Sequence, residues 1–107
     1  MTNGKISNGK ITVTISFLST LRHIAGKSKV KMSFVENTLK NLIQVIQKEY
    51  FGAKISLFYF DQNNYMKLND EVILLINNVD YRVNGEIDSI ILDDGDNIVF
   101  LSSIHGG

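Results

Sequence analysis

The chain has 107 residues, of which 11 are basic and 11 acidic, and it contains no cysteine, proline or tryptophan. This length predicts one small domain whose hydrophobic core folds without disulfides. Because cysteine is absent, thiol catalysis, thiolate metal sites and redox pairs are excluded, and the composition fits a reducing, cytoplasmic compartment. The longest aliphatic run, Val72–Ile76, is far shorter than the ~20 residues of a membrane span, so no membrane association is expected.

The zero net charge hides an asymmetry along the chain. Residues 1–60 carry nine basic and two acidic side chains, whereas residues 61–107 carry two basic and nine acidic ones. If these halves segregate in the fold, the acidic half steers the protein toward a basic partner and not toward nucleic acid. We therefore expect no direct nucleic-acid binding.

The first half of the chain predicts an arm, a strand, a short helical turn and a second strand. Residues 1–10 are mostly polar and are expected to form a flexible arm ahead of a folded domain at 11–102. Residues 11–17 alternate apolar and polar side chains, which is typical of a strand with one buried face. The helical turn is expected to end at Gly26. The second strand presents an apolar face formed by Val30, Met32 and Phe34.

An amphipathic helix is predicted next from the spacing of apolar residues. Asn37 or Thr38 can cap its N-terminus, and Gly52 is placed to end it. Its apolar face is formed by residues three or four positions apart, namely Leu39, Leu42, Ile43, Ile46 and Tyr50. The following stretch, 53–71, mixes apolar residues with turn-forming Asp and Asn, and we expect it to be irregular.

Three more strands are predicted in the last third. Val72–Ile76 is apolar on both alternations, as in a strand covered on both faces, and the Asn pair that follows favours a turn with positive φ. Residues 81–83 are expected to return as a short strand. An acidic turn at 93–96 then precedes a final strand at 97–102.

This order of elements predicts an α+β fold of the β-grasp type. It combines a mixed sheet of four to five strands with one main crossing helix. The helix follows the first pair of strands, and the last strand is expected to pair beside the first.

The two terminal glycines, Gly106 and Gly107, are the most informative local feature. A chain of ordinary glycine content ends in Gly-Gly only about once in 200. Because glycine has no Cβ, a tail running from Ser102 to Gly107 can thread a narrow channel and reach at most about 20 Å. Its terminal carboxylate has a pKa of about 3.5, so it is a poor electrophile until it is activated, as in an acyl adenylate. A frayed end without function is the alternative.

The segment ILLINNVDYRVNGEIDSIILDDGDNIVFLSSIHGG, residues 73–107, resembles the C-terminal third of the ubiquitin-related modifier family. The shared features are an aliphatic strand, an Asn with an Asp-aromatic turn, an acidic Gly-Asp turn, a Phe-Leu-Ser strand and a His-Gly-Gly end. The opening, residues 13–26 with the segment FLSTLRHIAG, resembles the first strand and turn of the molybdopterin synthase small subunit and ThiS group, which shares the β-grasp fold. Residues 68–71 depart from the Arg-Pro-Gly that the modifier family typically has before its central strand.

The resemblance implies a sulfur carrier that is a cosubstrate and not an enzyme, with no bound cofactor. A ubiquitin-activating-like enzyme that uses ATP would adenylate Gly107 and convert it to a thiocarboxylate. The sulfur would then pass to a tRNA thiolation enzyme for 2-thiolation of wobble uridine, and the same end would be joined to lysines of target proteins. Ile104, His105 and Gly106 are implied as tail-recognition residues within the segment 103–107.

Two other functions stay open at this point. One is the small subunit of a molybdopterin-synthase-like complex, where the same tail delivers sulfur to a pterin; the His-Gly-Gly end favours the modifier. The other is a ubiquitin-like interaction module whose tail never reacts.

The final strand also suggests a docking face, because Ile98 to Leu101 are all apolar. By similarity to the spacing in ubiquitin, we expect Ile98 and Phe100 to point inward, and Val99 and Leu101 to point outward toward a partner. The alternative is that the segment 53–71 covers this second face.

Other candidate sites are weaker. Ser19 and His23 are four residues apart but are better explained as a helix cap and a surface residue. The acidic turn at 93–96 lacks the spacing of a calcium loop, and no metal site is evident. Three lysines, Lys27, Lys29 and Lys31, are typical of a wet strand face.

Overall fold

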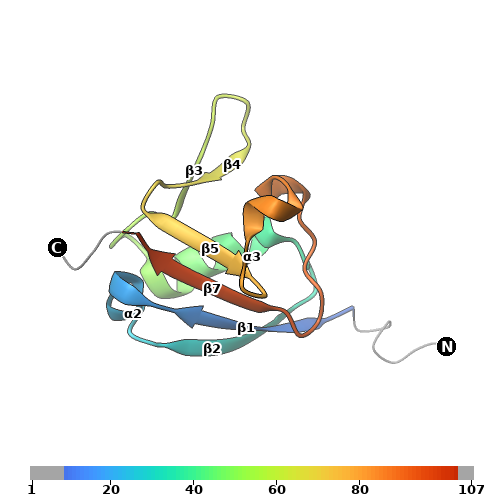
Figure 1. Cartoon of the computed structure of the whole chain (residues 1–107), viewed down its shortest axis with the longest axis horizontal. Coiled ribbons are helices and arrows are strands. Elements are labelled where there is room, and N and C mark those ends of the chain that lie inside the picture. Colours follow the sequence, from blue (N-terminus) through green and yellow to red (C-terminus); the bar gives the residue numbers. More distant parts are fainter. Residues whose placement is uncertain (1–8, 104–107) are drawn as a thin grey trace.

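The computed structural model describes residues 9–103, which form a five-stranded mixed sheet with one helix packed across its inner face (Figure 1). The strand order is β2-β1-β7-β5-β6. The predicted α+β, β-grasp arrangement is confirmed. The strands of this sheet are β1 (Ile11–Phe17), β2 (Lys29–Phe34), β5 (Val72–Ile76), β6 (Val79–Asp80) and β7 (Asn97–Ser102).

The centre of the sheet is β7, which joins the two ends of the sequence. It pairs in parallel with β1 and antiparallel with β5, as expected for a last strand that lies beside the first. The alternation of β1 buries Val13, Ile15 and Phe17 completely, because strand side chains point to opposite faces in turn.

The helical turn α2 (Ser19–Ala25) connects β1 to β2 and ends as the sequence predicts. Gly26 adopts a left-handed conformation with φ of 76°, and its N–H donates to the carbonyl oxygen of Arg22 at 3.0 Å. Such a conformation is costly for residues with a Cβ, so Gly26 fixes the point where the chain turns into β2.

The main helix, α3 (Leu39–Ile46), lies against the inner face of the sheet and continues as a π-helical turn, η1 (Gln47–Phe51). The hydroxyl oxygen of Thr38 accepts a hydrogen bond from the backbone N–H of Asn41, so Thr38 is the cap. A π turn holds more residues than an α turn, which shifts the next inward position beyond Ile46 from Tyr50 to Phe51. Phe51 is accordingly 1% exposed and packs edge-on against Phe17, whereas Tyr50 is only half-buried.

This shift gives a first prediction. Phe51→Ala is expected to lower the free energy of unfolding by about 3–5 kcal/mol, because it removes a fully buried ring from the core. Tyr50→Ala, at the position that a regular α-helix would bury, is expected to cost less. Urea unfolding of both variants measures the difference, and an equal or larger loss at Tyr50 contradicts the π register.

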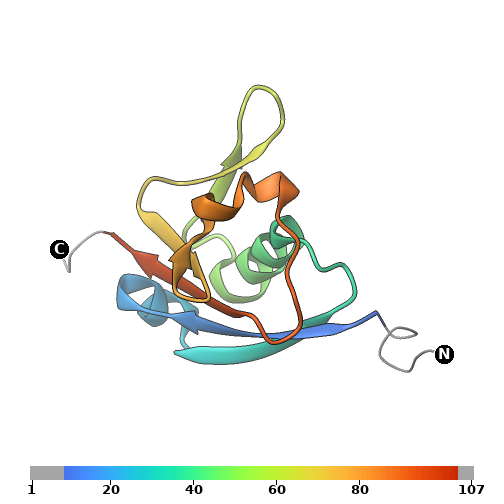
Figure 2. The same ribbon diagram turned by 45° about the vertical axis from the view of Figure 1, so that its right-hand side comes forward.

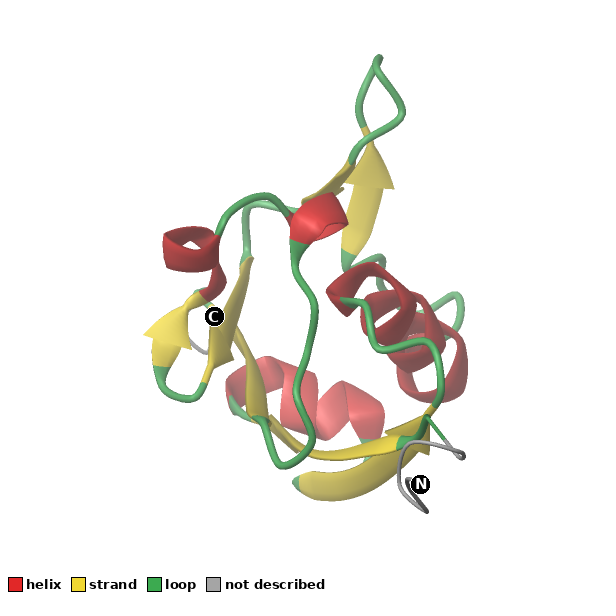
Figure 3. Cartoon of the chain, turned by 90° about the vertical axis from the view of Figure 1, so that its right-hand side faces the viewer, coloured by secondary structure: helices red, strands yellow, loops and turns green. Residues whose placement is uncertain are grey.

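The segment expected to be irregular instead contains a hairpin, so that expectation is wrong. Its strands are β3 (Phe58–Phe60) and β4 (Met66–Leu68), which pair antiparallel and project away from the sheet and α3 (Figures 2 and 3). The carboxylate of Asp61 organises the turn by accepting hydrogen bonds from the backbone N–H groups of Asn63 and Tyr65. The Asp and Asn residues that suggested a break therefore form the connection between two short strands.

The short strand expected at 81–83 is also wrong. The return strand is β6, which begins two residues earlier, directly after Asn77 and Asn78 turn the chain with φ of 52° and 70°. The carboxylate of Asp80 then accepts a hydrogen bond from the backbone N–H of Arg82, and this cap starts the 3-10 turn η2 (Tyr81–Asn84). A second 3-10 turn, η3 (Ile87–Ser89), contacts α3 and β4.

Candidate functional site

The predicted reactive tail, Ile104, His105, Gly106 and Gly107, lies outside the described residues. The point from which it starts is well defined, because the backbone N–H of Ser103 donates to the carbonyl oxygen of Glu71 at 2.8 Å. The chain is thus held to the body of the protein up to the end of β7. Four further residues can extend roughly 14 Å from that point.

The two faces of β7 have the orientation that the sequence predicts. Ile98 and Phe100 are 0% exposed in the core, whereas Val99 and Leu101 lie on the opposite face and are half-buried. The alternative is that the segment 53–71 covers this outward face. The hairpin in that segment contacts η3 instead, and neither Val99 nor Leu101 is buried, as a covering layer would require.

The strand register extends this outward surface across β5. Val99 lies opposite Leu75, and Leu101 lies opposite Ile73. These four half-buried side chains form the outer apolar patch: Ile73, Leu75, Val99 and Leu101. The sequence suggested that β5 is covered on both faces, but only its inward residues are buried, so its outward ones contribute to this surface instead.

Leu18 borders the outer apolar patch and was not identified from the sequence. Its backbone N–H donates to the carbonyl oxygen of Phe100 at 3.0 Å, which places it beside the end of β7, and its side chain is 44% exposed. The alternation of β1 indicates this orientation, because the residue that directly follows the inward Phe17 points to the outer face. The surface next to the tail is therefore wider than β7 alone.

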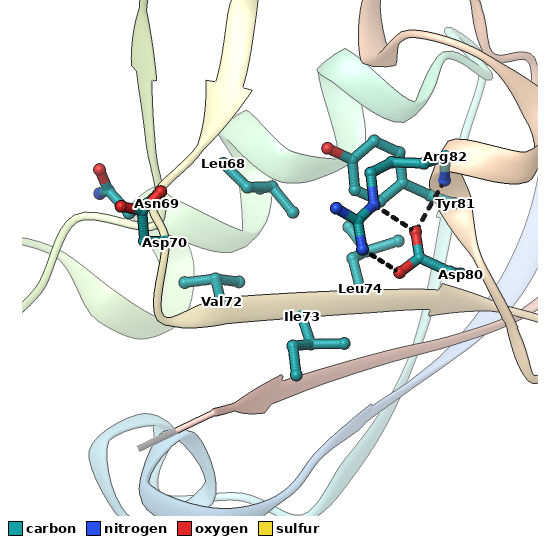
Figure 4. A pocket seen from close by; sticks show the side chains of 9 residues that line it. All are labelled: Leu68, Asn69, Asp70, Val72, Ile73, Leu74, Asp80, Tyr81 and Arg82. Carbon is teal, nitrogen blue, oxygen red and sulfur yellow. Dashed lines mark hydrogen bonds and ion pairs between the residues drawn. The ribbon is translucent and has the colours of Figure 1, made fainter.

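A small pocket of about 180 Å³ lies next to this surface, between β5, the end of β4 and η2 (Figure 4). Val72, Ile73 and Leu74 of β5 line this pocket, and the side chain of Ile73 points to the opposite side of the strand from the other two (Figure 4). The opposite wall is closed by an ion pair in which Arg82 Nη2 donates to Asp80 Oδ2 at 2.7 Å.

The Asp80–Arg82 pair gives a second prediction. Hydrogen bonds from the guanidinium and backbone of Arg82 lower the pKa of Asp80 from 3.8 to about 2. Because the pKa is lower in the folded state, the stabilisation is present above pH 3.8 and is lost as the pH falls toward 2. Arg82→Ala is expected to raise the pKa of Asp80 while leaving it below 3.8, since the backbone N–H still donates.

The measurement is an NMR titration of the Asp80 carboxylate in both proteins. Arg82→Lys is the matched control, because it keeps the charge but loses the two-point geometry of the guanidinium. An unchanged pKa of Asp80 in Arg82→Ala contradicts the assignment of the shift to this pair.

The weaker candidates have structural explanations. Asp94 accepts a hydrogen bond from the backbone N–H of Thr12, and Asp96 accepts one from the amide of Asn77, so this acidic turn ties the sheet together. Within residues 9–103 no cluster of three or more His, Cys, Asp or Glu side chains is placed to hold a metal. Over the same range, no side-chain hydrogen bond joins Ser19 to His23. Ser19 is the first residue of α2 and not its cap, because the N-cap position is Leu18, without a side-chain cap hydrogen bond. No helix in this part of the chain has the length and apolarity needed to cross a bilayer.

Comparison with known proteins identifies similar sequences along almost the whole chain. The model of the family described as Urm1 (Ubiquitin related modifier) matches residues 12–107. Ubiquitin-related modifier 1 of Saccharomyces cerevisiae is 35% identical over 103 residues, which cover 91% of this chain and 99% of the yeast protein. Ubiquitin-related modifier 1 of Mycosarcoma maydis is 50% identical over 72 residues, covering 67% of this chain and 63% of that protein.

Solved structures share the fold at low sequence identity. The Rurm1-related protein from Plasmodium yoelii superposes with a TM-score of 0.73 and 20% identity, covering 89% of this chain and 99% of that one. Urm1 from Trypanosoma brucei superposes with a TM-score of 0.68 and 24% identity, covering 92% of this chain and 97% of that one. A putative molybdopterin converting factor subunit 1 from Pyrococcus furiosus superposes with a TM-score of 0.62 and 19% identity, covering 88% of this chain and 99% of that one. The β-grasp core is therefore shared by this chain, the Urm1-related structures and the molybdopterin converting factor subunit.

Proposed function

Because the chain belongs to the ubiquitin-related modifier family, we propose that it is a protein sulfur carrier whose C-terminal carboxylate, on Gly107, is the reacting group. The observation that carries the proposal is the match of the family model through residue 107, where the sequence ends in His-Gly-Gly. Gly106 and Gly107 leave the backbone narrow enough to enter a channel that side chains would block. The protein acts as a cosubstrate, and the catalytic groups belong to its partners.

The chemistry requires activation because an ionised carboxylate resists attack by nucleophiles. In an activating enzyme, an oxygen of the Gly107 carboxylate attacks the α-phosphate of ATP and releases pyrophosphate, forming an acyl adenylate. A persulfide sulfur then attacks the acyl carbon and expels AMP. Reduction of the resulting acyl disulfide by a thiol leaves a thiocarboxylate on Gly107.

Two acceptors follow from this activated end. The thiocarboxylate donates its sulfur to a tRNA thiolation enzyme, which forms 2-thiouridine at the wobble position. Alternatively, a lysine amine of a target protein attacks the activated acyl carbon and forms an isopeptide bond. Neither reaction requires the carrier itself to bind nucleic acid, and we assign it a cytoplasmic location.

Docking on the activating enzyme is assigned to the outer apolar patch, with Val99 and Leu101 at its centre. Its position supports this, because the hydrogen bond from Ser103 to Glu71 fixes the start of the tail at the end of the same strand. A partner that covers the patch therefore receives the tail from a defined point and direction. Ile104, His105 and Gly106 then contact the channel that leads to the reactive centre.

The test is the intact mass of the protein after incubation with a ubiquitin-activating-like sulfurtransferase, Mg-ATP and a persulfide source. We expect a mass gain equal to the replacement of one oxygen by sulfur, and no gain when ATP is omitted. An enzyme that thiolates another carrier but leaves this protein unchanged contradicts the proposal.

The molybdopterin-synthase-like role is the second candidate, favoured by the similarity of residues 13–26 to that group. It predicts a stable complex with a large catalytic subunit, which a pull-down with that subunit detects. The intact-mass measurement separates both carrier roles from a passive ubiquitin-like module, which forms complexes without any change in mass at its C-terminus.

A further inference from the structure

The edge of the sheet formed by β2 is long and open. β2 pairs with β1 along six residues, and nothing else in residues 9–103 pairs with its other side. The opposite edge of the sheet, β6, is only two residues long. An open strand presents a row of backbone N–H and C=O groups that can hydrogen-bond to another extended chain.

The two faces of β2 at this edge differ in chemistry. On the outer face, Lys29 and Lys31 are exposed and have no ion-pair partner among the described residues. On the inner face, Val30, Met32 and Phe34 pack against the core but are only partly buried. The register confirms these faces, because Val30 lies opposite the buried Ile15 and Met32 lies opposite the buried Val13.

We propose that β2 binds an extended acidic segment of a partner protein, which adds to the sheet as a further strand. The added strand alternates acidic and apolar residues. Its acidic side chains lie beside Lys29 and Lys31, and its apolar side chains cover the exposed parts of Val30 and Met32. Backbone hydrogen bonds give such pairing its affinity, and the alternating side chains give it specificity. The proposal is independent of the sulfur-carrier function, because β1 separates β2 from β7.

Charge complementarity selects this occupant over others. A second copy of the chain that paired through β2 would bring lysines against lysines, which is destabilising for directly opposed like charges. Residues 1–8 of the chain contain Lys5 and no acidic residue, so they do not complement the edge either. Edge lysines also protect open strands from aggregation, and this protective role alone predicts no binding of an acidic strand.

The probe is a synthetic ten-residue peptide of alternating Glu and Val, titrated into the 15N-labelled full chain and followed by NMR. We expect amide shift changes at 29–34 and unchanged shifts at Val99 and Leu101. The matched control peptide, of alternating Lys and Val, is expected to bind at least about tenfold more weakly, since like charges oppose it. A Glu-Val peptide that carries N-methyl groups on the pairing edge is expected to lose binding.

Charge-reversal variants of the protein test whether Lys29 and Lys31 select the acidic peptide. K29E/K31E is expected to bind the Glu-Val peptide about tenfold more weakly and to bind the Lys-Val peptide more tightly than the original chain does. K48E/K54E, with the same change of charge outside the sheet, is expected to behave like the original chain. The proposal is overturned if the N-methylated or Lys-Val peptide binds the original chain equally well, if a single-stranded RNA shifts the same amides with equal affinity, or if the free protein dimerises through β2.

Discussion

Deletion of Gly107 is expected to reduce thiocarboxylate formation about 100-fold or more. The deletion leaves a carboxylate on Gly106, but it withdraws that group from the activating centre by about 3.3–3.6 Å, the length of one extended residue. Adenylate formation requires the carboxylate oxygen within reach of the α-phosphate, and a misplacement of even about 1 Å can cost 100-fold in rate. The readout is the fraction of protein that gains the sulfur mass in a fixed time.

Gly107→Ala provides the matched control, because it keeps the tail length and adds only a methyl group. This variant separates the effect of tail length from the effect of channel width. A large loss of thiocarboxylate formation with Gly107→Ala shows that the channel excludes a Cβ. Both variants are expected to retain the urea unfolding midpoint of the original chain, since the core ends at Phe100. A deletion variant that still gains sulfur at the original rate would remove Gly107 from the reaction.

The core strands of the fold are predictable from sequence because their patterns are local. The alternation at 11–17 determines which side chains β1 buries, and the spacing from Leu39 to Ile46 predicts the inward face of α3. The pairing of β7 beside β1 follows from the order of the elements. These features depend on periods of 2 and 3.6 residues, which the printed sequence displays directly.

The incorrect predictions share a different cause. The π turn moves the buried position from Tyr50 to Phe51, and periodicity does not reveal where a helix changes its pitch. Asp61 and Asp80 act through side-chain hydrogen bonds to nearby backbone groups, which convert an expected loop into a hairpin and an expected strand into a 3-10 turn. Such local competition is decided by geometry that residue type alone does not specify.

The site was only partly predictable for a similar reason. The outward orientation of Val99 and Leu101 follows from alternation within one strand. The contribution of Ile73 and Leu75 depends on the register between β5 and β7, which brings together residues more than twenty positions apart. Apolar residues on both alternations of β5 predict a strand covered on both faces, whereas its outward residues form half of the outer apolar patch.

Replacement of Val99 and Leu101 by Ser in one variant is expected to weaken binding to the activating enzyme by about 10- to 100-fold. These two side chains lie at the centre of the outer apolar patch, where the residues that matter most to binding are found, and a combined loss of about 1.4–2.8 kcal/mol for the pair corresponds to this change in affinity. The fold should persist, because both are only half-buried and lost cross-strand contacts cost about 0.2–1 kcal/mol each. Affinity is measured by calorimetry with the enzyme and no ATP, so that binding is separated from chemistry.

V83S/I91S is the matched control for this experiment. Val83 and Ile91 are 73% and 59% exposed, and both lie outside the strands of the sheet, so the variant removes at least as much exposed apolar surface from outside the patch. We expect it to bind with the affinity of the original chain. If V99S/L101S also binds with that affinity, the docking face lies elsewhere. If both variants lose affinity equally, general surface hydrophobicity, and not the patch beside the tail, determines the encounter. An isolated loss in V99S/L101S, together with a fixed tail start at Ser103, explains how a partner that holds only the sheet positions a carboxylate roughly 14 Å away.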